Sequence, residues 1–112
     1  MSHEAQLFWA LGYCIFILVL FFIVKLYPPK KINWWYGYRT NRSMKNEEIW
    51  KVTQEYSSKK SIQLALLSFL FPPLFYFTFP AYNFLLTVII NSLLIVSVIY
   101  FTEKYLKEQF KD

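Results

Sequence analysis

The residues best suited to binding chemistry lie in one polar stretch, residues 28–60. Arg39 and Arg42 sit close together just before a predicted helix start, and guanidinium groups bind phosphates and carboxylates through paired hydrogen bonds. Backbone N–H groups at a helix N-terminus also favour anions. The pattern predicts a corner that holds a lipid phosphate or a carboxylate, or one that only anchors to anionic headgroups. Residue types alone favour anchoring.

No arrangement typical of an enzyme or a metal site accompanies these arginines. His3 and Cys14 stand far apart, whereas a metal ion needs clustered ligands. Glu47 and Glu48 are adjacent, so on a helix their side chains would point about 100° apart. We interpret them as partners of the helix dipole and of the arginines, not as a catalytic pair. The sequence therefore predicts no enzymatic activity, no cofactor, no metal and no nucleic-acid partner.

The composition indicates that a lipid bilayer surrounds most of the chain. Of its 112 residues, 56% are hydrophobic and 17% charged, whereas soluble chains carry roughly 25% charged residues. Three apolar runs are each long enough to cross a membrane at ~1.5 Å per helical residue. The predicted fold class is an all-α membrane protein, one domain over residues 1–112. Its spans are expected at about residues 7–26, 61–79 and 82–102.

Two proline-containing sites and one polar pair are notable within these spans. Pro72 and Pro73 remove backbone donors and are predicted to kink the second span, and Pro80 and Ala81 predict a tight turn into the third. Asn91 and Ser92, near the centre of the third span, are expected to tie helices together rather than bind a solute. The spans contain no Asp, Glu, Arg or His, so the relay of a proton-coupled transporter is not expected.

The net charge of +5 predicts the orientation of the chain. Residues 28–60 hold eight Lys and Arg against three Glu, and short loops rich in Lys and Arg stay in the cytoplasm. The N-terminus is therefore expected outside, with the 28–60 segment and the tail inside. Residues 1–6 carry no Lys or Arg, which favours a membrane span over a cleaved signal peptide.

The 28–60 segment also carries local structure signals. Gly37 lies among aromatic residues and predicts a turn with positive φ. Ser43 is the predicted N-cap of an amphipathic helix over residues 44–58 that would lie on the inner membrane surface. Ile49, Val52 and Tyr56 form its apolar stripe.

Taken together, the segment resembles the signature of the SdpI-like (Sdp immunity protein) family of small bacterial membrane proteins, roughly Asn-x-x-x-Gly-x-Arg-Thr and then Asn-Glu-Glu-x-Trp. The matching or flanking residues, which are our predicted binding residues, are Asn33, Tyr36, Gly37, Arg39, Thr40, Arg42, Asn46, Glu47, Glu48 and Trp50. The chain departs from the family pattern at Gln54, where many relatives have His or Asn, and at Ser57-Ser58, where they have Gly-Gly.

The resemblance implies a multi-pass protein of the bacterial cytoplasmic membrane. The best-known relative protects its producer from a secreted membrane-active toxin and holds a repressor at the membrane. We therefore expect an immunity or sensing protein whose partners are the bilayer, a peptide toxin and a cytoplasmic regulator, with a homo-oligomer also open. The alternative is a holin-like pore former, because three spans with a charged inner tail are also a holin layout.

Overall fold

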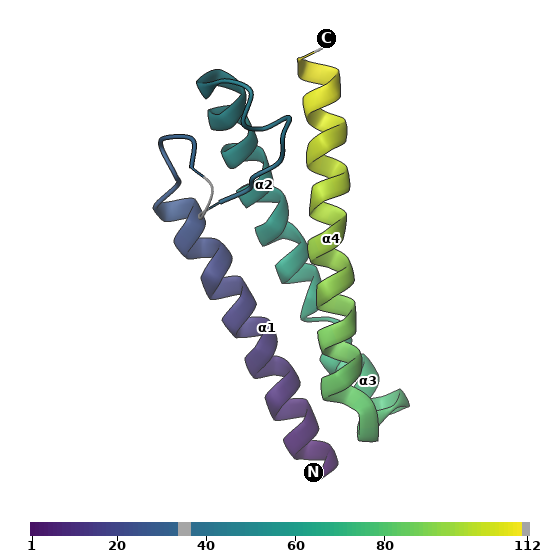
Figure 1. The fold of residues 1–112 in the computed structure, drawn as a ribbon. Coiled ribbons are helices and arrows are strands. Elements are labelled where there is room, and N and C mark those ends of the chain that lie inside the picture. The colour runs from purple at the N-terminus through teal and green to yellow at the C-terminus, as the bar shows by residue number, and fades with distance from the viewer. Residues whose placement is uncertain (34–36, 111–112) are drawn as a thin grey trace.

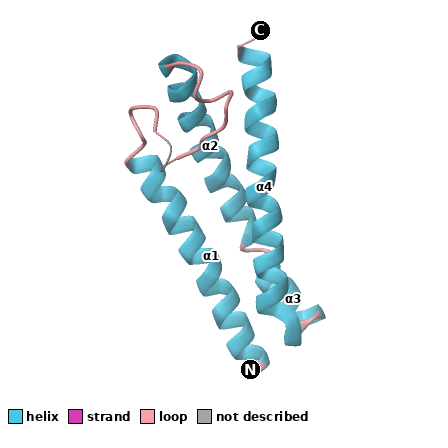
Figure 2. Cartoon of the chain, viewed as in Figure 1, coloured by secondary structure: helices cyan, strands magenta, loops and turns pink. Residues whose placement is uncertain are grey.

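A computed structural model describes residues 1–33 and 37–110 as a bundle of long helices (Figure 1). The elements in chain order are α1 (His3–Leu26), α2 (Glu47–Ser68), α3 (Phe71–Thr78), the short 3₁₀ helix η1 (Pro80–Tyr82) and α4 (Asn83–Gln109). The start of α1 and the end of α4 lie at opposite ends of the bundle, and the long loop between α1 and α2 folds back over one end (Figure 2). Strands are absent from the part of the chain that the structure describes.

Three helical stretches are long and apolar enough to cross a membrane: residues 3–26, 47–78 and 80–109. The predicted number of spans is confirmed, and each helical stretch is longer than the span predicted for it. Large apolar side chains face outward, such as Phe8 and Phe77, which are 73% and 82% exposed. Many of the buried residues are instead small or polar, including Ser68, Thr87 and Asn91, beside a few large apolar ones such as Trp50 and Leu106. This distribution suits a bundle surrounded by lipid, where small residues allow helices to pack closely.

The prolines interrupt the second span as predicted. Helix α2 ends at Ser68, α3 begins at Phe71, and Pro72 and Pro73 occupy the first turn of α3, where their missing N–H groups cost least. Pro72 has no N–H to donate to the carbonyl of Ser68, four residues earlier. The Cys14 thiol donates to that carbonyl instead, with sulfur and oxygen 3.8 Å apart. A neighbouring helix thus satisfies the carbonyl that the proline leaves free.

Polar side chains also join the helices at their centre and at the N-terminal end of α1. Asn91 donates to the Thr87 carbonyl at 3.0 Å and to the Cys14 sulfur at 3.6 Å, which confirms its predicted role between helices. Ser92 is exposed and only bonds within its own helix. Gln6 clamps the hairpin: it donates to the carbonyl of Ala81 at 3.1 Å and accepts from the N–H of Phe84 at 2.9 Å.

The predicted separate helix over residues 44–58 is wrong. Helix α2 runs without a break from Glu47 to Ser68, so its first turns continue in line with the second span and form no separate helix. These turns pack upright against α4, where the rings of Tyr56 and Tyr105 stack with centroids 4.2 Å apart. Of the predicted stripe, Ile49 is buried and Tyr56 half-buried, so the stripe serves packing within the bundle.

We predict that Gln6→Leu loosens the hairpin end of the bundle. Two hydrogen bonds between segments are lost, and each contributes about 0.6 kcal/mol in a membrane protein, so the free energy of unfolding should fall by roughly 1 kcal/mol. Unfolding in mixed detergent micelles measures it. The matched control is Gln63→Leu at an exposed glutamine of α2, and an equal loss in both variants would contradict the clamp.

Candidate functional site

The predicted motif residues form a folded corner at the loop end of the bundle. We call residues 37–43, with their partners Gln54 of α2 and Glu103 of α4, the loop corner. It begins at Gly37, whose φ of +92° confirms the predicted turn. A Cβ added to Gly37 would come within 2.6 Å of both Gln54 Oε1 and Pro29 Cγ. Glycine is therefore required here by its backbone angle and by close packing.

Gln54 fastens the backbone of the corner to α2. Its side-chain oxygen accepts from the N–H of Tyr38 at 2.9 Å, and its amide nitrogen donates to the carbonyl of Tyr38 at 2.7 Å. The residue is only 4% exposed, so these bonds are shielded from water. Sequence reasoning noted Gln54 only as a departure from the family pattern. Its residue type was the signal that could have identified it, because a side-chain amide offers both the donor and the acceptor that the backbone N–H and C=O of one residue need.

Glu103 fastens the same corner to α4. Its carboxylate accepts from the hydroxyl of Thr40 at 2.6 Å, from the hydroxyl of Tyr38 at 2.8 Å and from Nε of Arg42 at 3.2 Å. Arg42 thus binds a carboxylate, as one of our alternatives expected, but this carboxylate belongs to the chain itself. Sequence reasoning missed Glu103 because it treated the tail only as a topology signal. The first acidic residue after the third span, at the predicted level of the arginines, was the available clue.

The N-cap predicted at Ser43 is wrong, because Ser43 belongs to the turn that follows Arg39. The Ser43 hydroxyl donates to the carbonyl of Thr40 at 2.9 Å and accepts from its N–H at 2.8 Å, so it closes a turn. Asn46 caps α2 instead: its side-chain oxygen accepts from the N–H of Ile49 at 2.8 Å. The helix starts three residues later than predicted because the Ser43 side chain is already engaged.

Trp50 holds the start of the loop against α2. It is fully buried, and its indole N–H donates to the carbonyl of Pro29 at 2.8 Å, which fixes the start of the loop to α2. Asn33 donates locally to the carbonyl of Lys31 at 3.0 Å. Tyr36 lies outside the described residues.

The remaining predicted residues point to solvent. Arg39, Glu47 and Glu48 are exposed, and both glutamates lie in the first turn of α2, where they complement its dipole. Within the described chain, the ion-pair partner of Arg42 is Glu103 and not one of these glutamates, so that part of our interpretation is wrong. No three His, Cys, Asp or Glu side chains among the described residues gather to hold a metal ion.

The corner also holds Tyr38 in its protonated form. Burial raises the pKa of the Tyr38 hydroxyl well above its ordinary value, and the hydrogen bond to Glu103 and the negative charge of Glu103 raise it further. The nearby Thr40 hydroxyl lowers it slightly. Tyr38 therefore remains a neutral donor to Glu103 at all physiological pH values.

We predict that substitution by alanine lowers the free energy of unfolding at Gly37 and does not lower it at Gly12. Gly37→Ala should lower the free energy of unfolding by about 1–3 kcal/mol, because alanine is strained at positive φ and collides with Gln54 and Pro29. Gly12→Ala is the matched control: nothing lies within 4 Å of its added Cβ, and alanine favours a helix by about 0.5–1 kcal/mol. Unfolding in mixed micelles measures both, and a harmless Gly37→Ala would refute the assigned geometry.

We predict that Glu103→Gln lowers the pKa of Tyr38 toward its ordinary value, because the negative charge is removed while burial remains. A pH titration of ¹³C-labelled tyrosine rings by NMR measures this, with Glu108→Gln as control. A raised folded-state pKa means that the folded chain keeps a proton that the unfolded chain releases. Stability from Tyr38 is thus complete below about pH 10 and lost as the pH rises further. An unchanged Tyr38 pKa in Glu103→Gln would contradict the contact.

Comparisons with known proteins identify the family of the chain. A family model for the SdpI/YfhL protein family matches residues 30–101, which include the loop corner and Gln54 and end just before Glu103. The "Uncharacterized protein YfhL" of Bacillus subtilis (strain 168) is 44% identical over 45 residues, which are 40% of this chain and 41% of that protein. No solved structure matches. Since the family model covers well over half of the chain, this three-span membrane protein belongs to the SdpI/YfhL family.

Proposed function

We propose that the chain is an immunity or sensing protein of the bacterial cytoplasmic membrane. It protects the cell against a membrane-active peptide toxin by binding the toxin or a partner protein. In the sensing role, the loop corner would be the face that meets a cytoplasmic regulator. The chain performs no catalysis in this proposal, and membership of the SdpI/YfhL family is its starting point.

The observation that carries the proposal is the double attachment of the loop corner. Gln54 holds its backbone to α2, and Glu103 holds its side chains to α4. A simple connector between two spans needs no such attachment. A recognition surface does, because a preformed face loses less conformational entropy when it binds. Arg39 is exposed on this rigid face and makes no ion pair or hydrogen bond with any described residue.

The distribution of charge supports an orientation with the N-terminus outside. The loop, the first part of α2 as far as Lys60 and the last turns of α4 carry the Lys and Arg of the described residues apart from Lys25, which ends α1 on the same side of the bundle (Figure 1). The opposite end, clamped by Gln6, has none. Positive residues are retained in the cytoplasm, so the loop corner would face inward.

We predict that deletion of the gene sensitises cells to a cognate antimicrobial peptide, and that neither Arg39→Ala nor Trp50→Ala restores survival. Arg39→Ala removes an exposed charge and should leave stability unchanged, whereas Trp50→Ala removes a buried brace and should cost about 3–5 kcal/mol. Survival is compared at equal amounts of protein in the membrane. Lys31→Ala, another exposed cation of the loop, is the control.

Full survival with Arg39→Ala would remove the proposed role of the exposed face. The same strains separate immunity from the holin alternative. A pore former collapses the membrane potential when overproduced, so a potential-sensitive dye should report depolarisation. An immunity protein leaves the potential intact, and a depolarised overproducing culture would overturn our proposal.

A further inference from the structure

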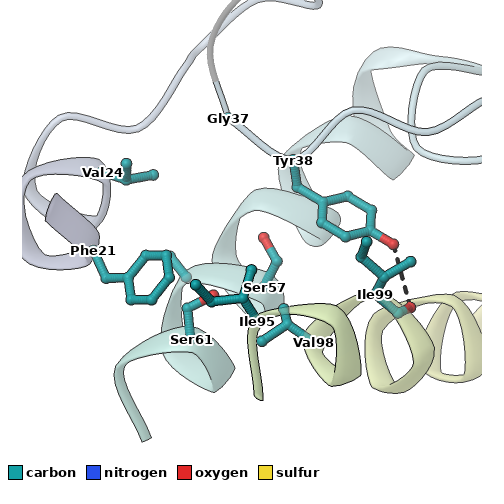
Figure 3. A pocket seen from close by; sticks show the side chains of 10 residues that line it. Phe21, Val24, Gly37, Tyr38, Ser57, Ser61, Ile95, Val98 and Ile99 are labelled. Atoms are coloured by element: carbon teal, nitrogen blue, oxygen red, sulfur yellow. Dashed lines mark hydrogen bonds between the residues drawn. The ribbon is translucent and has the colours of Figure 1, made fainter. Parts of the chain in front are cut away.

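A cavity of about 280 Å³ lies directly beneath the loop corner, between α1, α2 and α4 (Figure 3). Its walls are mostly apolar: Phe21 comes from α1, and Ile95, Val98 and Ile99 come from α4. Tyr38 forms its roof. Apolar cavities of about 150 Å³ already bind small apolar molecules, so this larger one has room for part of a ligand.

One polar group in the cavity has no partner. Ser61 of α2 lines the cavity and is only 8% exposed, yet its hydroxyl makes no hydrogen bond with any described residue. Other buried serines of α2 are satisfied: Ser68, for example, donates to the carbonyl of Ala65 at 2.6 Å. The Ser61 oxygen is open to the cavity, unlike the enclosed and unpartnered Thr102 Oγ1, so a ligand in the cavity can supply the acceptor that the described chain does not. Figure 3 shows Ser61 and Phe21 reaching from α2 and α1 into the same space.

The residue types around the cavity indicate that it lies near the level where lipid tails meet their polar headgroups. Its α1 wall, Phe21 and Val24, belongs to the last turns of that helix, just before Lys25 and Tyr27, residue types that prefer the membrane interface. On the α4 side, Ile95 and Ile99 are exposed, so the cavity adjoins the surface that meets lipid. Phospholipid ester carbonyls occupy this boundary, and they accept hydrogen bonds without donating any.

We propose that this cavity binds one acyl chain of a phospholipid, with the Ser61 hydroxyl donating a hydrogen bond to the ester carbonyl. The first methylene groups of the chain pack against Phe21, Ile95 and Ile99. A helical peptide is a poorer fit, because a helix with its side chains is ~10–12 Å wide. The bound chain fills the space under Tyr38 and thereby couples the lipid to the loop corner. This site goes beyond the proposed function and does not depend on it.

The test compares ester and ether phospholipids. The whole protein is reconstituted in vesicles of phosphatidylethanolamine and phosphatidylglycerol, extracted gently, and examined by native mass spectrometry. We expect one retained phospholipid. A dialkyl ether analogue lacks the carbonyl and should compete about two- to tenfold less well for the wild-type protein. In Ser61→Ala this preference should vanish. Equal competition by both lipids in the wild type, or an unchanged preference in Ser61→Ala, would overturn the proposal.

Filling the cavity provides a second, independent variant. Ser61→Phe should abolish retention of the lipid, whereas Ser92→Phe adds the same bulk on an exposed face of α4 and should leave retention unchanged. Retention by Ser61→Phe equal to wild type would overturn the site, as would a co-purifying peptide in place of a lipid. Toxin survival is not a readout here, so failure of the lipid site and failure of the immunity proposal are separate results.

Discussion

A bilayer offers no water to the polar groups inside it, and most of this architecture follows from the need to pair those groups within the protein. Pro72 leaves the carbonyl of Ser68 without its helical donor, and the Cys14 thiol of α1 supplies one. Asn91 of α4 meets the same thiol. The centre of the bundle is therefore held by polar contacts, because lipid tails give apolar side chains little reason to prefer the interior.

The same need to pair polar groups within the protein shapes the loop corner at the end of the bundle. A polar loop that folds back onto helices must satisfy its backbone, and Gln54 does so for Tyr38 with one donor and one acceptor. The Glu103 carboxylate accepts three hydrogen bonds from the loop: Arg42 balances its charge, and the hydroxyls of Tyr38 and Thr40 solvate it. Gly37 makes this possible, since any larger residue would separate the loop from Gln54. The motif residues thus build a scaffold and leave Arg39 as its exposed cation.

Much of this could be read from the chain. The three spans, the interruption at Pro72 and Pro73 and the turn at Gly37 depend on local composition or on a backbone preference of one residue, and all three are confirmed. The predicted helix over residues 44–58 is wrong at both ends. It starts later because Ser43 and Asn46 are both good N-caps and Ser43 is already bonded to Thr40, and it does not end at residue 58 because α2 continues to Ser68.

The sequence by itself determined that the chain is a three-span membrane protein and that residues 28–60 carry its family signature, because hydropathy and motif spacing are properties of short segments. Only the tertiary structure decided which side chains meet. Glu103 lies 61 residues from Arg42, and its carboxylate becomes the anion of the arginine corner only when α4 packs beside α2. The cavity with the unpartnered hydroxyl of Ser61 arises in the same way, since three helices and the loop must come together before its walls exist.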